Sequence, residues 1–194
     1  MMVRLYSNMN KIEVYKKQFN YYKELADSAV DQLDDKDLFF QIGEEVNSIA
    51  VIMKHLSGNM HSRWTNLFQE DGEKDWRNRD EEFIDRFEDI NQLKAYWEAG
   101  WDVLFSTLDS LSEKDLDRTI YIRNMGCSVH DAIIRQLCHY PYHVGQIVHI
   151  AKELKGKSFK SLSIPKGESK TYNTQRFSKE KSMKHFTDDK DTQS

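Results

Sequence analysis

The chain has 194 residues, of which 39% are hydrophobic and 31% are charged, and its formal net charge is −4. This composition fits one domain with a substantial core, and two prolines and eight glycines are too few for an all-β fold. No apolar run approaches the roughly 18–20 residues of a membrane span, and the first residues lack the apolar region of a signal peptide. We therefore expect a helical, cytoplasmic protein without a membrane partner.

Three long segments within the first 110 residues carry apolar side chains at helical spacing. Each predicts an amphipathic helix, at about residues 3–33, 43–69 and 79–110. The third helix is expected to start near Asn78, because Glu81 follows three residues later, as in a capping box.

A fourth helix is expected from Ser128 to about Leu154, with Gly156 as its stop. Before it, residues 119–123 form a short β-like run within an otherwise irregular connection. Four helices of this length predict an all-α domain over residues 1–170, with the architecture of a four-helix bundle.

The last 40 residues are basic, with ten Lys or Arg against five Asp or Glu, whereas the rest of the chain is acidic. A basic tail can indicate nucleic-acid binding. Here both signs of charge are mixed and aromatic residues are few. We therefore interpret residues 171–194 as a polar, flexible tail and expect no nucleic-acid partner.

The histidines give the strongest functional signal. His139 and His143 stand four residues apart in the fourth predicted helix, so both imidazoles lie on one face, one turn apart. Helical phase places this pair at the edge of the apolar stripe, where a cleft between helices would open. Pro141 lies between them and can either kink the helix so that both rings face the cleft, or spoil their spacing. The sequence leaves both outcomes open.

A third ligand has to come from another helix, and His55 in the second predicted helix is the best candidate, although it can also be a half-exposed surface histidine. Its face carries Ser48 and Asn59, a polar mixture typical of a pocket. Three neutral imidazoles bind divalent ions such as Zn²⁺ or Ni²⁺ and leave a position open for water or substrate. Gln146, which can orient a ring nitrogen, and Tyr142 complete the candidate pocket residues.

A histidine on the second helix together with His-x-x-x-His-x-Gly-Gln on the fourth resembles the DinB/YfiT-like superfamily. The resemblance rests on five residues: His55, His139, His143, Gly145 and Gln146. It spans about residues 5–170, and further segments look like an uncharacterised bacillar branch. The resemblance implies a four-helix bundle, often dimeric, that holds a divalent metal ion on the three histidines.

The resemblance also implies a class of reaction. Related enzymes transfer low-molecular-weight thiols to electrophiles, or use such a thiol to isomerise substrates. We therefore expect a homodimeric, metal-dependent enzyme that transfers a thiol to a small electrophilic substrate. No catalytic acid or base can be carried over to a residue of this chain. A metal-dependent hydrolase and a non-catalytic, dimeric metal-binding or stress-associated protein are the alternatives.

Overall fold

The structure is a computed structural model that describes residues 10–84, 87 and 89–188. Its described part is mostly helical, as the composition predicts. The helices are α1 (Lys11–Val30), α2 (Ile49–Trp64), α3 (Ile90–Ser110), α4 (Val129–Lys155) and the short α5 (Ser169–Phe177). Two strands, β1 (Thr119–Ile122) and β2 (Met125–Ser128), pair in an antiparallel hairpin where the β-like run was predicted.

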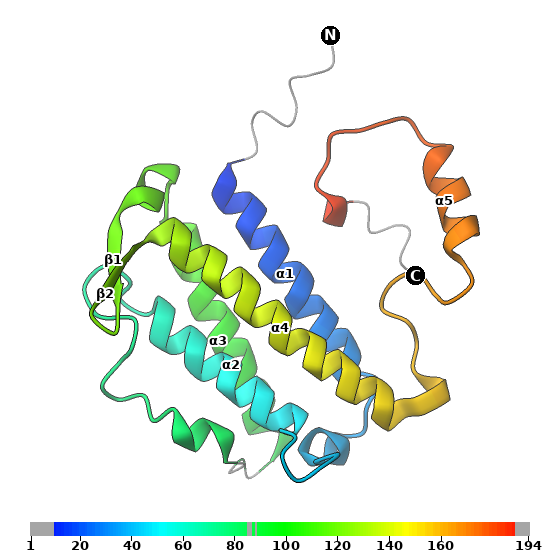
Figure 1. Ribbon diagram of the computed structural model, residues 1–194, viewed down its shortest axis with the longest axis horizontal. Helices are drawn as coiled ribbons and strands as arrows, with labels where there is room; N and C mark the ends of the chain where they lie inside the picture. Colours follow the sequence, from blue (N-terminus) through cyan, green and yellow to red (C-terminus); the bar gives the residue numbers. More distant parts are fainter. Residues whose placement is uncertain (1–9, 85–86, 88, 189–194) are drawn as a thin grey trace.

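The four long helices lie side by side, with α1 packed against α4 and α2 packed against α3 (Figure 1). Helices α2 and α4 run past each other in opposite directions, and the β1–β2 hairpin lies beside the start of α4. Helix α5 stands apart from the other helices and buries no residue (Figure 1). No helix among the described residues is long and apolar enough to cross a membrane.

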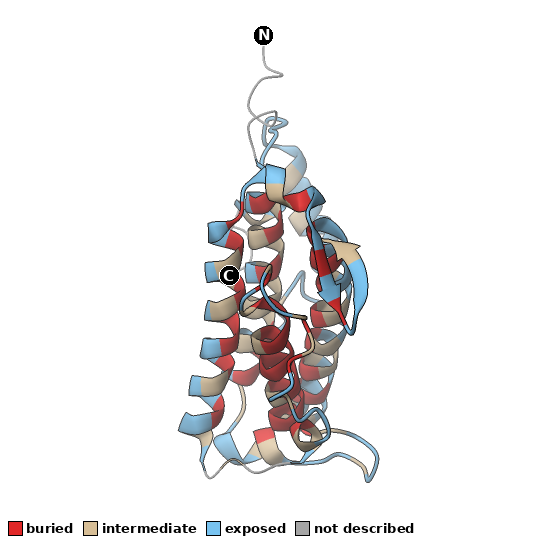
Figure 2. Cartoon of the chain, turned by 90° about the vertical axis from the view of Figure 1, so that its left-hand side faces the viewer, coloured by how far each residue is buried: buried red, intermediate tan, exposed pale blue. Residues whose placement is uncertain are grey.

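Large aromatic side chains fill the interior, and the buried residues face inward from all four long helices (Figure 2). Tyr140 of α4 lies where these helices meet, with its ring against Phe19 of α1 and Trp101 of α3. Its hydroxyl accepts a hydrogen bond from Trp64 Nε1 (3.0 Å) and donates one to Asn59 Oδ1 (3.1 Å), both on α2. This one side chain therefore connects α4 to the other three long helices.

Helix α2 is shorter than predicted. It begins at Ile49 rather than near residue 43, because the Ser48 side chain caps it by accepting a hydrogen bond from Val51 N (3.2 Å). It ends at Trp64 rather than near residue 69, and Thr65 already has an extended backbone. The start predicted for the first helix, near residue 3, lies outside the described residues.

The predicted start of the third helix is wrong. Helix α3 begins at Ile90, where Asp89 caps it by accepting a hydrogen bond from Gln92 N (2.9 Å). The hydrogen bond expected at Asn78 does form, with Glu81 N donating to its Oδ1 (3.4 Å), but the residue before the single-turn 3₁₀ helix η3 (Asp80–Phe83) is Arg79, which makes no side-chain cap. The turn η3 is therefore separate from α3 and packs against α2.

Helix α4 has the predicted ends. Ser128 caps its start by accepting a hydrogen bond from Asp131 N (3.0 Å). Gly156 follows its last residue with a positive φ of 58°, a conformation that glycine adopts without strain. The helix continues through Pro141 without interruption.

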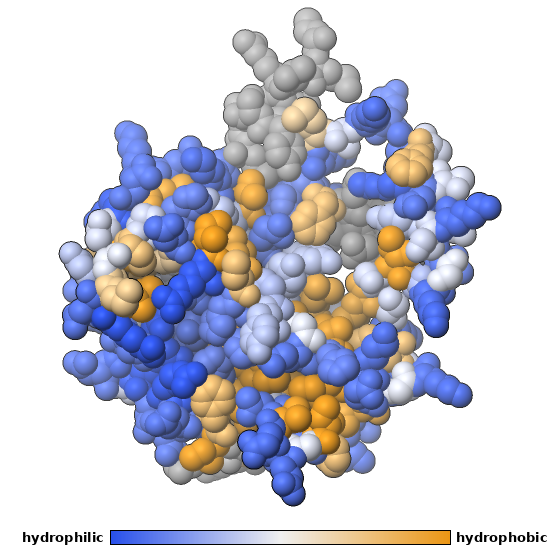
Figure 3. All heavy atoms as spheres, in the orientation of Figure 1, coloured by the Kyte–Doolittle hydropathy of each residue, from blue (hydrophilic) through white to orange (hydrophobic). Residues whose placement is uncertain are grey.

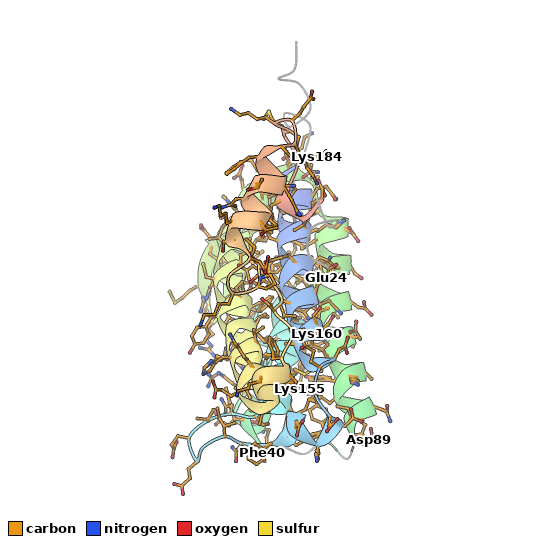
Figure 4. All side chains as sticks on the ribbon, turned by 90° about the vertical axis from the view of Figure 1, so that its right-hand side faces the viewer. Glu24, Phe40, Asp89, Lys155, Lys160 and Lys184 are labelled. Atoms are coloured by element: carbon orange, nitrogen blue, oxygen red, sulfur yellow. The ribbon has the colours of Figure 1, made fainter. Side chains whose placement is uncertain are left out.

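After α4 the chain turns back toward α1. The Gln32 side chain binds both main-chain groups of Lys160, at 2.6 Å to its N and 3.2 Å to its O. Figure 4 shows Lys155 at the end of α4 and Lys160 beyond it on this returning segment. The domain boundary expected at residue 170 falls inside α5.

The contact between α2 and α3 depends on Gly100, because a Cβ there would lie 2.9 Å from Ser57 Cα. Gly100→Ala should force the two backbones apart and lower the free energy of unfolding by about 1–3 kcal/mol in urea denaturation. Gly145→Ala is the control, since a Cβ on this exposed part of α4 meets no atom within 4 Å. In the control, the free energy of unfolding should rise by about 0.5–1 kcal/mol. Equal stability of the two variants would contradict the close packing of α2 and α3.

Candidate metal centre

The structure brings together the three histidines predicted from the sequence. One candidate ligand atom from each of His55, His139 and His143 lies within 4.8 Å of the others. The Nε2 atoms of His55 and His139 are 3.4 Å apart, and the ring centroids of His139 and His143 are 4.8 Å apart. His55 is buried rather than half exposed, at 5% exposure. Pro141 does not spoil the ring spacing, since α4 continues through it and both rings line one cavity.

Each of the three imidazoles is held at its Nδ1 atom by a side-chain oxygen. The pairs are His55 with Glu82 Oε2 (2.9 Å), His139 with Gln136 Oε1 (3.1 Å) and His143 with Gln146 Oε1 (2.7 Å). Since these oxygens accept hydrogen bonds, the ring proton lies on Nδ1 in every case. In the neutral form of each ring, the Nε2 lone pair is then available to a ligand.

The distance between the Nε2 atoms of His55 and His139 indicates which kind of group fits between them. With both protons on Nδ1, two lone pairs face each other across 3.4 Å and cannot form a hydrogen bond between them. Two nitrogen ligands at about 2.0–2.1 Å from a tetrahedral zinc ion are themselves about 3.3–3.4 Å apart. The observed separation and the donor type both fit a shared divalent cation.

A proton is a poor substitute for that cation. Burial, followed by the charges of His143, His55, Arg63 and Arg77, lowers the pKa of His139 to about 3. Burial also lowers the pKa of His143. Both rings are therefore neutral at pH 7, which is the form that binds metal ions.

Glu82 supports His55 from outside α2. It lies on η3 with a side chain only 7% exposed, and Arg77 holds both of its oxygens, at 2.7 Å and 2.9 Å. Burial alone would raise the pKa of Glu82, but hydrogen bonds from His55 and Arg77 lower it overall, so the carboxylate stays ionised. Gly58 makes room for it, because a Cβ there would overlap Glu82 Oε1. A carboxylate behind a histidine fixes the ring and raises its basicity as a ligand.

The other predicted pocket residues have different positions. Gln146 holds a ring nitrogen, as predicted, and its Nε2 is 3.5 Å from the Tyr142 hydroxyl. Asn59 and Tyr142 line the cavity in front of the histidines. Ser48 does not line it, because this residue is the cap of α2, about two turns away from His55.

Two residues that hold imidazoles were missed from the sequence. Gln136 precedes His139 by three residues, just as Gln146 follows His143 by three, so helical spacing alone could have identified it. Glu82 gave no such signal, because its segment was assigned to the start of the third helix.

A cavity of about 520 Å³ opens at the imidazoles, a size that suits a small molecule. It lies on the side of α2 and the β1–β2 hairpin, where the surface is mainly hydrophilic (Figure 3). No Asp or Glu is found among the described residues that line it. The charged residues of its lining are instead five arginines: Arg63, Arg77, Arg79, Arg123 and Arg135.

A family model matches most of the chain. The model of the DUF1572 family, described as a protein of unknown function, matches residues 7–168. No curated protein and no solved structure matches the chain. The matched region contains α1 to α4, the three histidines and Glu82. The chain therefore belongs to the DUF1572 family of proteins of unknown function.

Proposed function

We propose that this chain is a DinB/YfiT-like metalloenzyme, a four-helix bundle that holds a divalent ion, Zn²⁺ or Ni²⁺, on His55, His139 and His143. The observation that carries the proposal is the set of three imidazoles with Nδ1 bound to oxygens and Nε2 lone pairs free. Three protein ligands leave one position open, which is typical of catalytic rather than structural sites.

We further propose that the reaction transfers a low-molecular-weight thiol to a small electrophile. A divalent ion at this site would lower the pKa of a thiol bound at the open position. A free thiol has a pKa of about 8.5 and water one of about 15.7, so the thiol needs the smaller shift to ionise at neutral pH. Because no described carboxylate lines the cavity as a general base, its chemistry favours the thiol over water.

The residues of the chain have positioning roles in this proposal. Glu82, Gln136 and Gln146 keep each imidazole in its metal-binding tautomer. The cavity admits the thiol and the electrophile together and opens to solvent. As sulfur bonds to the electrophilic carbon, the thiol proton leaves to solvent, and the electron pair displaced from that carbon takes up a proton from solvent. Homodimer formation and a cytoplasmic location stay predictions.

The metal site can be tested by calorimetry on protein produced without a histidine tag and stripped with chelator. The wild type should bind an equimolar amount of Zn²⁺ or Ni²⁺, and His139→Ala should lose at least about 100-fold in affinity. Gly58→Ala keeps all three ligands but displaces Glu82, so it should lose about 10–100-fold. His130→Ala is the control, because His130 is exposed and stacks on Tyr15.

Equal metal affinity in the wild type and His139→Ala would contradict the assigned ligands. Equal affinity in the wild type and Gly58→Ala would contradict the supporting role of Glu82.

The reaction can be tested by supplying metal-loaded protein with small thiols and electrophiles, and separately with esters and amides. We expect turnover that requires both metal and thiol and that disappears in His139→Ala. Thiol-independent cleavage of an ester or amide would contradict thiol transfer and support the hydrolase. Metal binding without any turnover would favour the non-catalytic alternative.

A further inference from the structure

The arginines around the cavity carry more positive charge than the nearby carboxylates neutralise. Five arginines line the cavity, and the carboxylates that pair with them are those of Glu73 and Glu82. Within the described residues, five guanidinium groups at this cavity therefore share two salt-bridged carboxylates, beside a proposed cation site. A concave surface of one charge sign concentrates ligands of the opposite sign.

Two of the five arginines belong to the wall of the cavity. Arg63 is 8% exposed, and two of its nitrogens lie 3.0 Å from Glu73 Oε2. The side chain of Arg77 is 2% exposed and is bound to Glu82 through two hydrogen bonds. Because these guanidinium groups are held by Glu73 and Glu82, they contribute to the wall and to its positive potential rather than to direct ligand binding.

The positive potential already affects the groups of the wall. Burial, and further the charge of Arg77, lower the pKa of Arg63 despite its contact with Glu73. An anion in the cavity would offset the repulsion between Arg63 and Arg77.

The other three arginines, Arg79, Arg123 and Arg135, are exposed and come from separate segments of the chain. Arg79 lies before η3 with its guanidinium 5.1 Å from the centroid of the Phe83 ring. Arg135 is on α4, one turn before His139 and on the same face. In the part of the chain that the structure describes, neither Arg79 nor Arg135 forms a salt bridge.

Arg123 is held in place by its main chain. It is at the turn between β1 and β2 with a positive φ of 55°. The Asp71 carboxylate accepts hydrogen bonds from the main-chain N of Arg123 (2.7 Å) and of Asn124 (2.8 Å). The Arg123 side chain is 58% exposed and keeps one contact with Glu73, at 3.2 Å. The hairpin turn is thus anchored while the guanidinium remains available to a ligand.

We propose that Arg79, Arg123 and Arg135 bind a doubly charged anionic group, a pair of carboxylates or a phosphate, on the substrate or the thiol cosubstrate of this site. Guanidinium groups pair with such oxygens through two parallel hydrogen bonds, which gives both affinity and orientation. The anionic end would lie at the arginines and the reacting end at the imidazoles. The assignment of the reacting end rests on the proposed function, whereas anion binding itself requires no metal.

Calorimetry on metal-free protein at about pH 8 tests the proposal. The probes are succinate, inorganic phosphate and the uncharged succinamide. Succinate or phosphate should bind the wild type and succinamide should not, and the preferred anion distinguishes carboxylate from phosphate recognition. Arg79→Gln and Arg135→Gln should each weaken binding about tenfold or more, with unchanged circular dichroism.

Lys157→Gln is the matched control, because it removes one exposed positive charge just beyond α4 and should bind like the wild type. Failure of both anions to bind the wild type, or equal binding in both arginine variants, would overturn the proposal. Anion binding in a protein that binds no metal would leave this proposal standing and refute the metal site. Metal binding without anion binding would refute this proposal and leave the metal site standing.

Discussion

The position of the imidazole protons is the constraint on which the site depends. The ionised carboxylate of Glu82 can only accept a hydrogen bond, so His55 must donate from Nδ1 and present a lone pair at Nε2. The amide oxygens of Gln136 and Gln146 impose the same tautomer on the other two rings. In the neutral rings, three lone pairs thus converge where protonation of His139 is strongly disfavoured, and a divalent cation would satisfy them.

The packing of the helices holds the three imidazoles in fixed relative positions. Tyr140 binds Trp64 and Asn59 of α2 and is the residue next to His139, so packing in the core fixes the distance between the helices that carry His55 and His139. Gly58 lets η3 approach α2 closely enough for Glu82 to reach its histidine. Ligands on packed helices, supported by fixed partners, hold their geometry better than ligands on loops.

Much of this arrangement can be predicted from the sequence, and the exceptions have physical causes. Helix α4 is predictable because its cap at Ser128, its stop at Gly156 and the spacing of its histidines are all local signals. The start of α3 is not, because the hydrogen bond from Glu81 N to Asn78 forms beside a single turn as well as it would at the start of a long helix. Because the segment before Ile90 was assigned to α3, Glu82 was not identified as a partner of His55. The arginines escaped notice because only the tertiary fold brings their separate segments to one cavity.

The fold therefore places a convergent set of neutral nitrogen donors beside a cationic cavity. X-ray absorption spectroscopy of the zinc-loaded protein tests the central claim, chelation by the three Nε2 atoms, most directly. It should show nitrogen or oxygen neighbours at about 2.0–2.1 Å with the outer-shell scattering of about three imidazoles, reduced by one in His139→Ala. A sulfur neighbour from the protein at about 2.3 Å, or an oxygen shell without imidazole scattering, would contradict the account.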